Sequence, residues 1–412
     1  MAHIVPFKAV RPPAHMAHLV ASRSFVTYKP ADLKRKLSEN PFTFIHIINP
    51  EFGQPVKTRP NSDRRFEKVK TRYEEFCNAG ILVQDPAPAF YVYRQDTAEA
   101  SFTGIICGVA VQEYLTGKIK IHEHTITERE ETFCRYLDIC GFNAEPVLLT
   151  FRENTAEVSA LTASVSALRP DYDFSTTDAH RHRLWPVTDP KAVRKIQASF
   201  SKISDLYIAD GHHRSASSAL LSRKRAARTS GHRSSSADFI LAMLIPADQL
   251  LIKPFHRLIC CPEFCDEEQL LHNLREDFHV IGQKQAVVPE DKRTWGLRVK
   301  SGWYRLTLKN PFHGVKASEK LDAVIFTKKI LEPQFGITDQ KTDRRLQFIP
   351  GTADIKKYED AIDSGKCTAL FTLCKVDPDE LFDVADAGEI MPPKSTWIAP
   401  KLRSGLTVMS LD

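Results

Sequence analysis

The stretch Leu206-Tyr207-Ile208-Ala209-Asp210-Gly211-His212-His213-Arg214-Ser215 joins a short apolar run to a polar turn. The apolar half predicts a buried strand, and residues Ser215 to Arg223 predict a helix with small apolar side chains on one face. Backbone N–H groups at the start of a helix have no acceptor within the helix, so they attract anions together with the helix dipole. The stretch therefore predicts a phosphate site at a strand-to-helix junction.

The side chains of the turn favour the same interpretation. Gly211 lets the backbone approach an anion closely, and the guanidinium of Arg214 can hold two phosphate oxygens. Asp210 can hold a divalent cation such as Mg²⁺ that bridges phosphates, while His212 and His213 add hydrogen-bond donors. The alternative is a polar loop with an ordinary helix cap. The sequence contains neither a Walker A pattern nor GxGxxG, so the predicted phosphate cradle is of another kind.

A second group of candidate residues is His122-Glu123-His124. In an extended segment over residues 118–124, His122 and His124 would share one face and Glu123 would lie on the other. A zinc site would need further ligands, and an exposed polar strand end is the plainer alternative. The functional hypothesis is that Glu123 is a general base near the phosphate cradle.

A third candidate is Pro393-Lys394-Ser395-Thr396 near the end of the chain. Its proline makes the start of the segment rigid, and Lys394, Ser395 and Thr396 are suitable partners for a phosphate or a substrate carboxylate. An ordered C-terminal tail is an equally good interpretation.

Composition limits the class of partner. The 412 residues predict two or three domains, and 57 basic against 51 acidic residues give a net charge of +6. This mild excess fits a small anionic ligand. The densest basic run, residues 223–228, is interpreted as a solvated loop after a helix, and no helix-turn-helix signature is present. Composition therefore argues against a nucleic-acid partner and leaves the oligomeric state open.

The same composition points to the cytoplasm. No apolar signal-peptide core follows Met1, and no stretch approaches the ~18 apolar residues of a membrane span, so we expect a cytoplasmic protein without a membrane partner. The nine cysteines form no CxxC pair. The cluster Cys260-Cys261 with Cys265 is interpreted as reduced thiols rather than as a zinc site.

Periodicity predicts mixed α and β structure. Strands are expected at 42–48, 90–93, 101–111, 145–151, 206–209, 239–245, 303–308 and 369–373. Helices are expected at 64–79, 127–140, 191–201, 215–223 and 322–331, while 180–186 is expected to be helix or loop. Thr127 and Glu130 are expected to form a capping box, and Gly141 to end that helix.

The chain resembles the domain of unknown function 1015 family over nearly its full length. The matching segments are residues 6–12, 118–125, 207–219 and 391–406. Where this family usually has a Pro-Pro-Tyr-Asp stretch, the chain has a different sequence at residues 21–28. We therefore expect this loop to differ from its counterparts.

The order of the central motifs also resembles SerK-like free L-serine kinases of the ParB/sulfiredoxin-like superfamily. The resemblance implies an α+β protein in which a ParB/SerK-like nucleotide-binding domain, 116–260, follows an N-terminal α/β domain, 1–115. A C-terminal α/β domain, 261–412, would complete the site. It implies that Glu123 is the catalytic glutamate and that Asp210 to Arg214 bind the nucleotide.

The activity implied by this resemblance is phosphoryl transfer from ADP, ATP or another nucleotide, with Mg²⁺, to the hydroxyl of free serine. The product would be O-phosphoserine, and a similar amino acid is an alternative acceptor. A non-catalytic, ParB-like nucleotide-binding regulator is the competing hypothesis. Glu123 distinguishes the two, because a pure switch has no need of a general base beside the phosphates.

Overall fold

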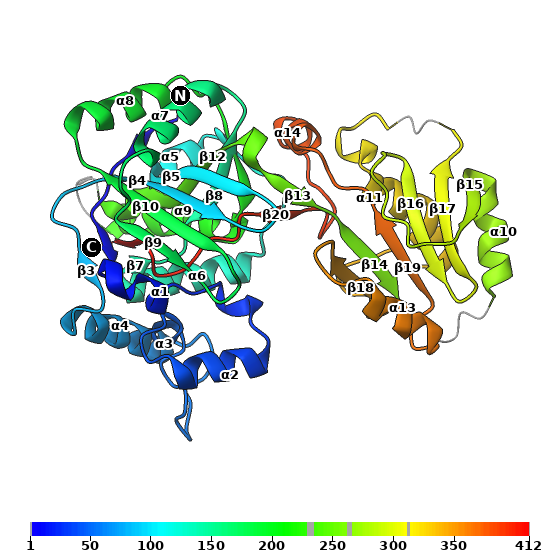
Figure 1. Cartoon of the computed structure of the whole chain (residues 1–412), viewed down its shortest axis with the longest axis horizontal. Coiled ribbons are helices and arrows are strands. Elements are labelled where there is room, and N and C mark those ends of the chain that lie inside the picture. The colour runs from blue at the N-terminus through cyan, green and yellow to red at the C-terminus, as the bar shows by residue number, and fades with distance from the viewer. Residues whose placement is uncertain (1, 229–234, 262–265, 311–313, 412) are drawn as a thin grey trace. The chain divides into compact units, whose positions relative to one another are not determined.

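The computed structural model (Figure 1) describes residues 2–228, 235–261, 266–310 and 314–411. Two compact units are present. The first consists of residues 1–250 and 400–412, and the second of residues 251–399. The predicted boundaries at 115/116 and 260/261 do not coincide with the boundaries of these units.

The first unit is built on a nine-stranded mixed sheet in the order β6-β11-β8-β12-β5-β4-β10-β9, with β1 paired to β5. Strands from both sides of residue 115 share this sheet, because β12 pairs antiparallel with β5 and parallel with β8. The nine strands are β1 (Ile4–Val5), β4 (Phe90–Asp96), β5 (Ser101–Ala110), β6 (Ile119–Lys120), β8 (Val147–Phe151), β9 (Tyr172–Ser175), β10 (Arg181–Val187), β11 (Leu206–Asp210) and β12 (Phe239–Pro246).

Alternate residues of the central strands form the main core. Cys107 of β5, Ala242 of β12 and Leu149 of β8 are fully buried there, as expected when every second side chain of a strand points to one face. Helices α7 and α8 add Val158 and Phe200 to the same cluster. The helices of this unit are α1 (Ala17–Val20), α2 (Pro30–Glu39), α3 (Ile45–Ile48), α4 (Asp63–Asn78), α5 (Val111–Leu115), α6 (Thr127–Cys140), α7 (Thr155–Ser166), α8 (Pro190–Phe200) and α9 (His212–Arg228).

The C-terminal residues return to the first unit. Strand β21 (Val408–Ser410) lies between β2 (Ala9–Arg11) and β7 (Phe142–Asn143) in a small sheet that β3 (Val83–Gln84) completes. Val408 joins a core cluster with side chains of α4 and β7. The C-terminal strand β21 thus contributes to the core of the first unit.

The second unit has a six-stranded antiparallel sheet in the order β15-β17-β16-β19-β14-β18 and a separate two-stranded pair, β13-β20. Its strands are β13 (Leu251–Lys253), β14 (Phe255–Ile259), β15 (Phe278–Gln283), β16 (Thr294–Val299), β17 (Gly302–Leu308), β18 (Leu346–Pro350), β19 (Ala369–Leu373) and β20 (Trp397–Ala399). Its helices are α10 (Glu267–Asp277), α11 (Asp322–Phe326), a π-helical segment (Thr327–Leu331), α12 (Glu332–Phe335), α13 (Lys356–Asp363) and α14 (Pro378–Asp386).

The mixed α and β architecture expected from the sequence is confirmed, while the ParB/sulfiredoxin-like arrangement stays a prediction. Four local predictions are wrong. Residues 42–48 contain the short helix α3 instead of a strand, and residues 181–187 form strand β10. The capping box is absent from α6, because Ile126 is the N-cap and Glu130 instead accepts a hydrogen bond from Thr125. The basic residues 223–228 belong to α9 rather than to a loop.

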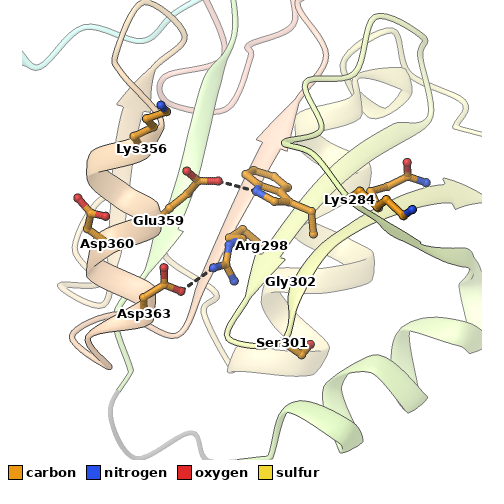
Figure 2. Close-up of a pocket in the computed structure, with 10 residues that line it drawn as sticks. Lys284, Arg298, Ser301, Gly302, Lys356, Glu359, Asp360 and Asp363 are labelled. Atoms are coloured by element: carbon orange, nitrogen blue, oxygen red, sulfur yellow. Dashed lines mark hydrogen bonds and ion pairs between the residues drawn. The ribbon is translucent and has the colours of Figure 1, made fainter.

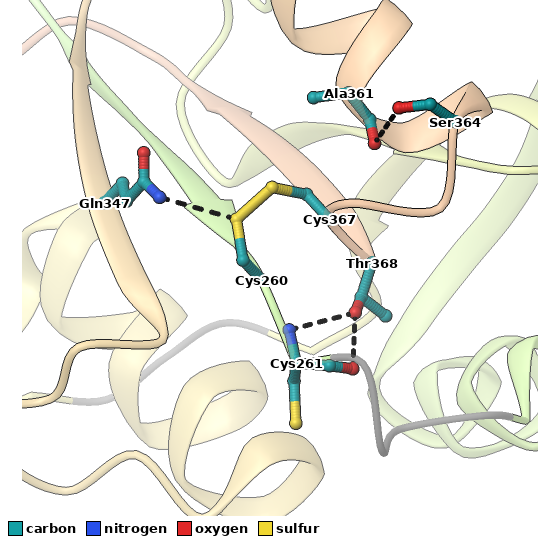
Figure 3. The surroundings of a disulfide bond; sticks show 7 residues. All are labelled: Cys260, Cys261, Gln347, Ala361, Ser364, Cys367 and Thr368. Carbon is teal, nitrogen blue, oxygen red and sulfur yellow. Dashed lines mark hydrogen bonds between the residues drawn. A yellow bond between two sulfur atoms is a disulfide. The ribbon is translucent and has the colours of Figure 1, made fainter.

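A disulfide joins Cys260 to Cys367 in the second unit (Figure 3). It ties the end of β14 to the segment before β19. The hydroxyl of Thr368 bonds both the N–H and the carbonyl of the neighbouring Cys261. The expectation of reduced thiols is therefore wrong for this pair, and Cys265 lies outside the described residues.

Candidate functional site

The predicted strand-to-helix junction is present. Strand β11 ends at Asp210, Gly211 adopts φ +107°, and α9 begins at His212. This positive φ is strained for residues other than glycine. A Cβ atom at Gly211 would also lie 3.1 Å from the guanidinium of Arg214. The turn therefore depends on glycine both for its backbone conformation and for space.

Arg214 holds the turn against the start of β8. Its Nη1 donates to the carbonyls of Glu145 and Pro146 at 3.1 and 2.6 Å, and lies 3.3 Å from the Glu145 carboxylate. Its Nη2 lies 3.2 Å from the Asp210 carboxylate. Both terminal nitrogens thus have protein acceptors, and direct binding of phosphate by Arg214 stays a prediction.

Two residues that the sequence did not single out join this turn. Lys401 Nζ lies 3.3 Å from the Asp210 carboxylate, and the Ser404 hydroxyl donates to Glu145 at 3.1 Å. Both belong to the C-terminal segment that returns to the first unit. The signal that could have revealed Lys401 is the repetition of Pro-Lys at Pro393-Lys394 and Pro400-Lys401.

The fit of Mg²⁺ to Asp210 depends on a nucleotide. In the described ranges, no group of three or more His, Cys, Asp and Glu side chains is placed to hold a metal ion. Mg²⁺ commonly takes one or two carboxylates and completes its shell with phosphate oxygens and water. Asp210 can meet that requirement only together with the phosphates of a ligand.

The loop that carries Glu123 lies beside the first turn of α9. The His122 and His212 rings are in edge contact, with centroids 4.5 Å apart, and the backbone N–H of His122 donates to His212 Nε2 at 3.4 Å. Because Nε2 accepts, the proton of a neutral His212 is on Nδ1, which lies 3.9 Å from the Glu123 carboxylate. The structure thus brings Glu123 and the predicted phosphate turn together.

The histidines of this junction are held neutral. Burial lowers the pKa of His122 to about 4. Burial, reinforced by His122 and His213, lowers the pKa of His212 well below its ordinary value. The pKa of His213 is also lowered, mainly by burial and by the charge of Arg129. These three imidazoles are therefore neutral at pH 7.

His122 and His124 do not share a face. Strand β6 covers only Ile119–Lys120, so the two histidines lie in an irregular loop, where His122 is buried and His124 is exposed. The expected strand periodicity fails because the backbone N–H of His122 bonds His212 instead of a neighbouring strand. A zinc pair at His122 and His124 has no geometric support here.

Lys394, Ser395 and Thr396 belong to the second unit. The Lys394 ammonium lies over the Phe255 ring, 5.5 Å from its centroid, and the Ser395 hydroxyl donates to the Pro392 carbonyl at 2.8 Å. Lys394 has φ +54°. These contacts support a defined conformation of the segment, and its role in binding stays a prediction.

A separate hollow of about 450 Å³ lies in the second unit, beside α13, β16 and β17 (Figure 2). Its larger side chains are already paired: Trp303 donates to Glu359 at 2.6 Å, and Arg298 to Asp363 at 2.5 Å. Lys284, Lys356 and Asp360 also line the hollow, but none of the motifs singled out in the sequence lies there, so it is a weaker candidate than the junction.

The family assignment rests on the sequence. The family model described as "Protein of unknown function (DUF1015)" matches residues 4–361. The chain belongs to the DUF1015 family. In a search of curated proteins, none matches this DUF1015 protein.

Solved structures show distant likeness. A free serine kinase in complex with AMP is 14% identical, covers 74% of this chain and 91% of its own, and gives a TM-score of 0.35. SbnI with a C-terminal truncation, from Staphylococcus aureus, is 12% identical with coverages of 74% and 87% and a TM-score of 0.36. A conserved hypothetical protein from Pyrococcus furiosus is 13% identical, with coverages of 74% and 95% and a TM-score of 0.34.

The helices were also compared with the requirements of a membrane span. None of the helices in the described ranges combines the length and the hydrophobicity that a bilayer span requires.

Proposed function

We propose that this DUF1015 protein is a nucleotide-dependent small-molecule kinase that phosphorylates the hydroxyl of free L-serine or a similar amino acid. The observation that carries the proposal is the position of Glu123 at the start of α9, 3.9 Å from His212 Nδ1. Its side chain is 58% exposed, so a substrate can reach it. Phosphoryl transfer needs mainly positioning and charge stabilisation, which a general base beside a phosphate turn supplies.

In the proposed reaction, the donor is ADP or ATP. The bond between the terminal phosphorus and its bridging oxygen breaks, and a new bond forms from that phosphorus to the hydroxyl oxygen of the acceptor. Glu123 accepts the hydroxyl proton. The first-turn N–H groups of α9 hold the phosphate oxygens, and Gly211 lets the backbone approach them. Mg²⁺ bound through Asp210 and the phosphates would neutralise developing charge.

Other predicted residues have supporting parts in this proposal. His212, whose Nδ1 lies 3.9 Å from the Glu123 carboxylate, helps to position Glu123, and His213 donates to the nucleotide. His122 has a buried Nδ1 without a hydrogen-bond partner among the described residues, which makes it suited to a substrate group. His124 is proposed to contact substrate or phosphate.

The alternative is a nucleotide-binding regulator without kinase activity. It is favoured by the ion pair between Asp210 and Lys401, which links the phosphate turn to the C-terminal segment. A bound phosphate competes with Asp210 for the Lys401 ammonium, so nucleotide binding could change the position of residues 400–404. Such a coupling needs no general base.

The deciding experiment compares turnover and binding in the full chain. We expect phosphoamino acid, detected by mass spectrometry, when the protein is incubated with Mg²⁺, ADP or ATP and a panel of hydroxyl amino acids. Glu123→Gln should lower turnover by about 10²- to 10⁴-fold, the usual contribution of a general base, with nucleotide affinity unchanged. Glu128→Gln, at an exposed glutamate on α6, is the matched control and should keep full turnover.

Each proposal has an outcome that rejects it. Wild-type protein that binds nucleotide but forms no phosphoamino acid would reject the kinase and leave the regulator. If neither Arg214→Ala nor Gly211→Ala changes nucleotide affinity, the phosphate role of the turn is wrong.

A further inference from the structure

A second polar cluster surrounds Arg403, two residues beyond Lys401. The Arg403 side chain is only 4% exposed. Its Nη2 donates to the Asp178 carboxylate at 2.7 and 2.8 Å and to the Thr176 hydroxyl at 3.2 Å. Its Nε is buried and has no acceptor among the described residues. This guanidinium therefore has one carboxylate partner and an unused donor.

A second arginine lies directly opposite Arg403. Ser22 and Ser404 form an antiparallel bridge, with backbone hydrogen bonds of 3.2 and 2.8 Å in the two directions. Antiparallel segments run in opposite directions, so the residue after Ser22 faces the residue before Ser404. Arg23 and Arg403 therefore occupy facing positions. Like charges in facing positions are destabilising. Arg23 stacks on the Tyr28 ring at 4.4 Å and pairs with no carboxylate in the part of the chain that the structure describes.

A third cation comes from α2. The Asn40 side chain at the end of this helix donates to the Leu19 carbonyl at 2.7 Å, which holds α2 against the segment that leads to Arg23. Lys36 is half-buried. Burial, together with the charges of Arg403 and Arg23, lowers the pKa of Lys36, while Asp178 opposes the shift. Among the described residues, Lys36 has no ion pair of its own.

The remaining polar groups add no negative charge. Burial, with Arg403 and Arg23, lowers the pKa of His180 against the opposing effect of Asp178. Burial lowers the pKa of His182 to about 3, and this imidazole bonds the Tyr93 hydroxyl at 2.7 Å. Both imidazoles are therefore neutral at pH 7. Arg403 therefore pairs with Asp178, whereas Arg23 and Lys36 pair with no carboxylate among the described residues.

We propose that Arg23, Lys36 and Arg403 form a binding site for a small organic carboxylate. Cations removed from water are costly unless an anion compensates them, and among the described residues only the Asp178 carboxylate contacts this cluster. A carboxylate matches the planar donor array of arginine and adds the missing negative charge.

The site is a neighbour of the phosphate turn. Lys401 contacts Asp210 and Arg403 contacts Asp178, and two residues span at most about 7 Å of extended chain. A carboxylate at Arg403 and a nucleotide at the turn can therefore be bound together. The bound carboxylate would be that of the amino-acid acceptor, an assignment that rests on the proposed function, whereas the carboxylate site itself does not.

The test is calorimetric titration of the full chain with L-serine, L-alanine and L-lactate, each compared with its amide. We expect at least one acid to bind at least about tenfold more tightly than its amide, since a charge-assisted hydrogen bond contributes more than 1.4 kcal/mol. Lys36→Ala and Arg23→Ala should each weaken that binding about tenfold. Lys34→Ala, at an exposed lysine on the same helix, is the control and should bind as wild type does.

Three outcomes would overturn the proposal: wild-type protein that binds none of the acids with a Kd below about 10 mM, amides that bind as tightly as acids, or unchanged affinity in both Lys36→Ala and Arg23→Ala. Inorganic phosphate that binds these residues when the acids do not would also overturn it. ADP affinity is measured on the same samples. Loss of carboxylate binding with intact ADP binding rejects this inference alone, whereas carboxylate binding without ADP binding rejects the proposed function alone.

Discussion

At the scale of single residues, Gly211 is the position on which the candidate site most depends. Gly211→Ala combines a strained positive φ with a close approach of Cβ to Arg214. We expect it to destabilise the first unit by about 1–3 kcal/mol and to lower nucleotide affinity, because Arg214 must move from the carbonyls at the start of β8. Chemical denaturation and nucleotide titration measure the two effects.

The control for this prediction is Gly117→Ala. Gly117 also has a positive φ, +76°, but a Cβ atom there meets nothing within 4 Å. It should therefore carry the backbone strain without any loss of nucleotide affinity. Equal nucleotide affinity in the two variants would contradict the role given to the contact between Gly211 and Arg214.

At the scale of elements, the contact between the Glu123 loop and α9 makes stability depend on pH. His122 is neutral in the folded protein, with its pKa lowered to about 4, whereas in the unfolded chain it takes up a proton below about pH 6.5. The unfolded state therefore binds more protons between these values. The free energy of unfolding should fall as pH drops from about 6.5 to 4, by on the order of 3 kcal/mol from this residue.

Urea denaturation across this pH range measures the effect. His122→Asn should flatten the pH dependence relative to wild type, while His124→Asn, at an exposed position of the same loop, should keep it. Other buried histidines, such as His182 and His256, titrate in every variant, so the difference between profiles is the informative quantity. Parallel profiles for wild type and His122→Asn would contradict the burial of this imidazole.

At the scale of the whole molecule, the first unit is closed by the C-terminal segment. Leu406 is 2% exposed, and Leu406→Ala should destabilise this unit by about 2–5 kcal/mol through the cavity that it leaves. Leu115→Ala, at a leucine that is 44% exposed in the same unit, is the control. Denaturation that affects both variants equally would argue that residues 400–412 contribute little to this unit.

The second unit is stabilised by the disulfide between Cys260 and Cys367. The bond spans 107 positions of sequence, so reduction should lower the stability of this unit by about 2–4 kcal/mol through the added freedom of its unfolded chain. In scanning calorimetry, a thiol reductant should move the unfolding transition of the second unit to lower temperature. It should leave the transition of the first unit where it is. Cys77→Ser, in the first unit, should leave the transition temperature of the second unit unchanged. Cys367→Ser should lower that temperature as reduction does.

Most of the elements that local periodicity predicted are present in the structure, and the wrong predictions have physical causes. The helix expected at 64–79 is α4, and the strands expected at 101–111 and 239–245 are β5 and β12. Residues 42–48 are apolar except for Thr43 and His46, and so short a run cannot distinguish a strand from a buried helix. Strand β10 contains polar side chains whose partners, such as Tyr93 for His182, lie far away in sequence.

The sequence by itself determined the strand, the glycine turn and the helix start at Asp210 to Arg214, because a positive φ and the free N–H groups of a first helical turn are local properties. Only the tertiary structure decided which distant side chains meet that turn. Lys401 reaches Asp210 from the returning C-terminal segment, and Arg23 faces Arg403 through the bridge between Ser22 and Ser404. Such pairings depend on how strands and returning segments pack, and no local pattern of residues encodes them.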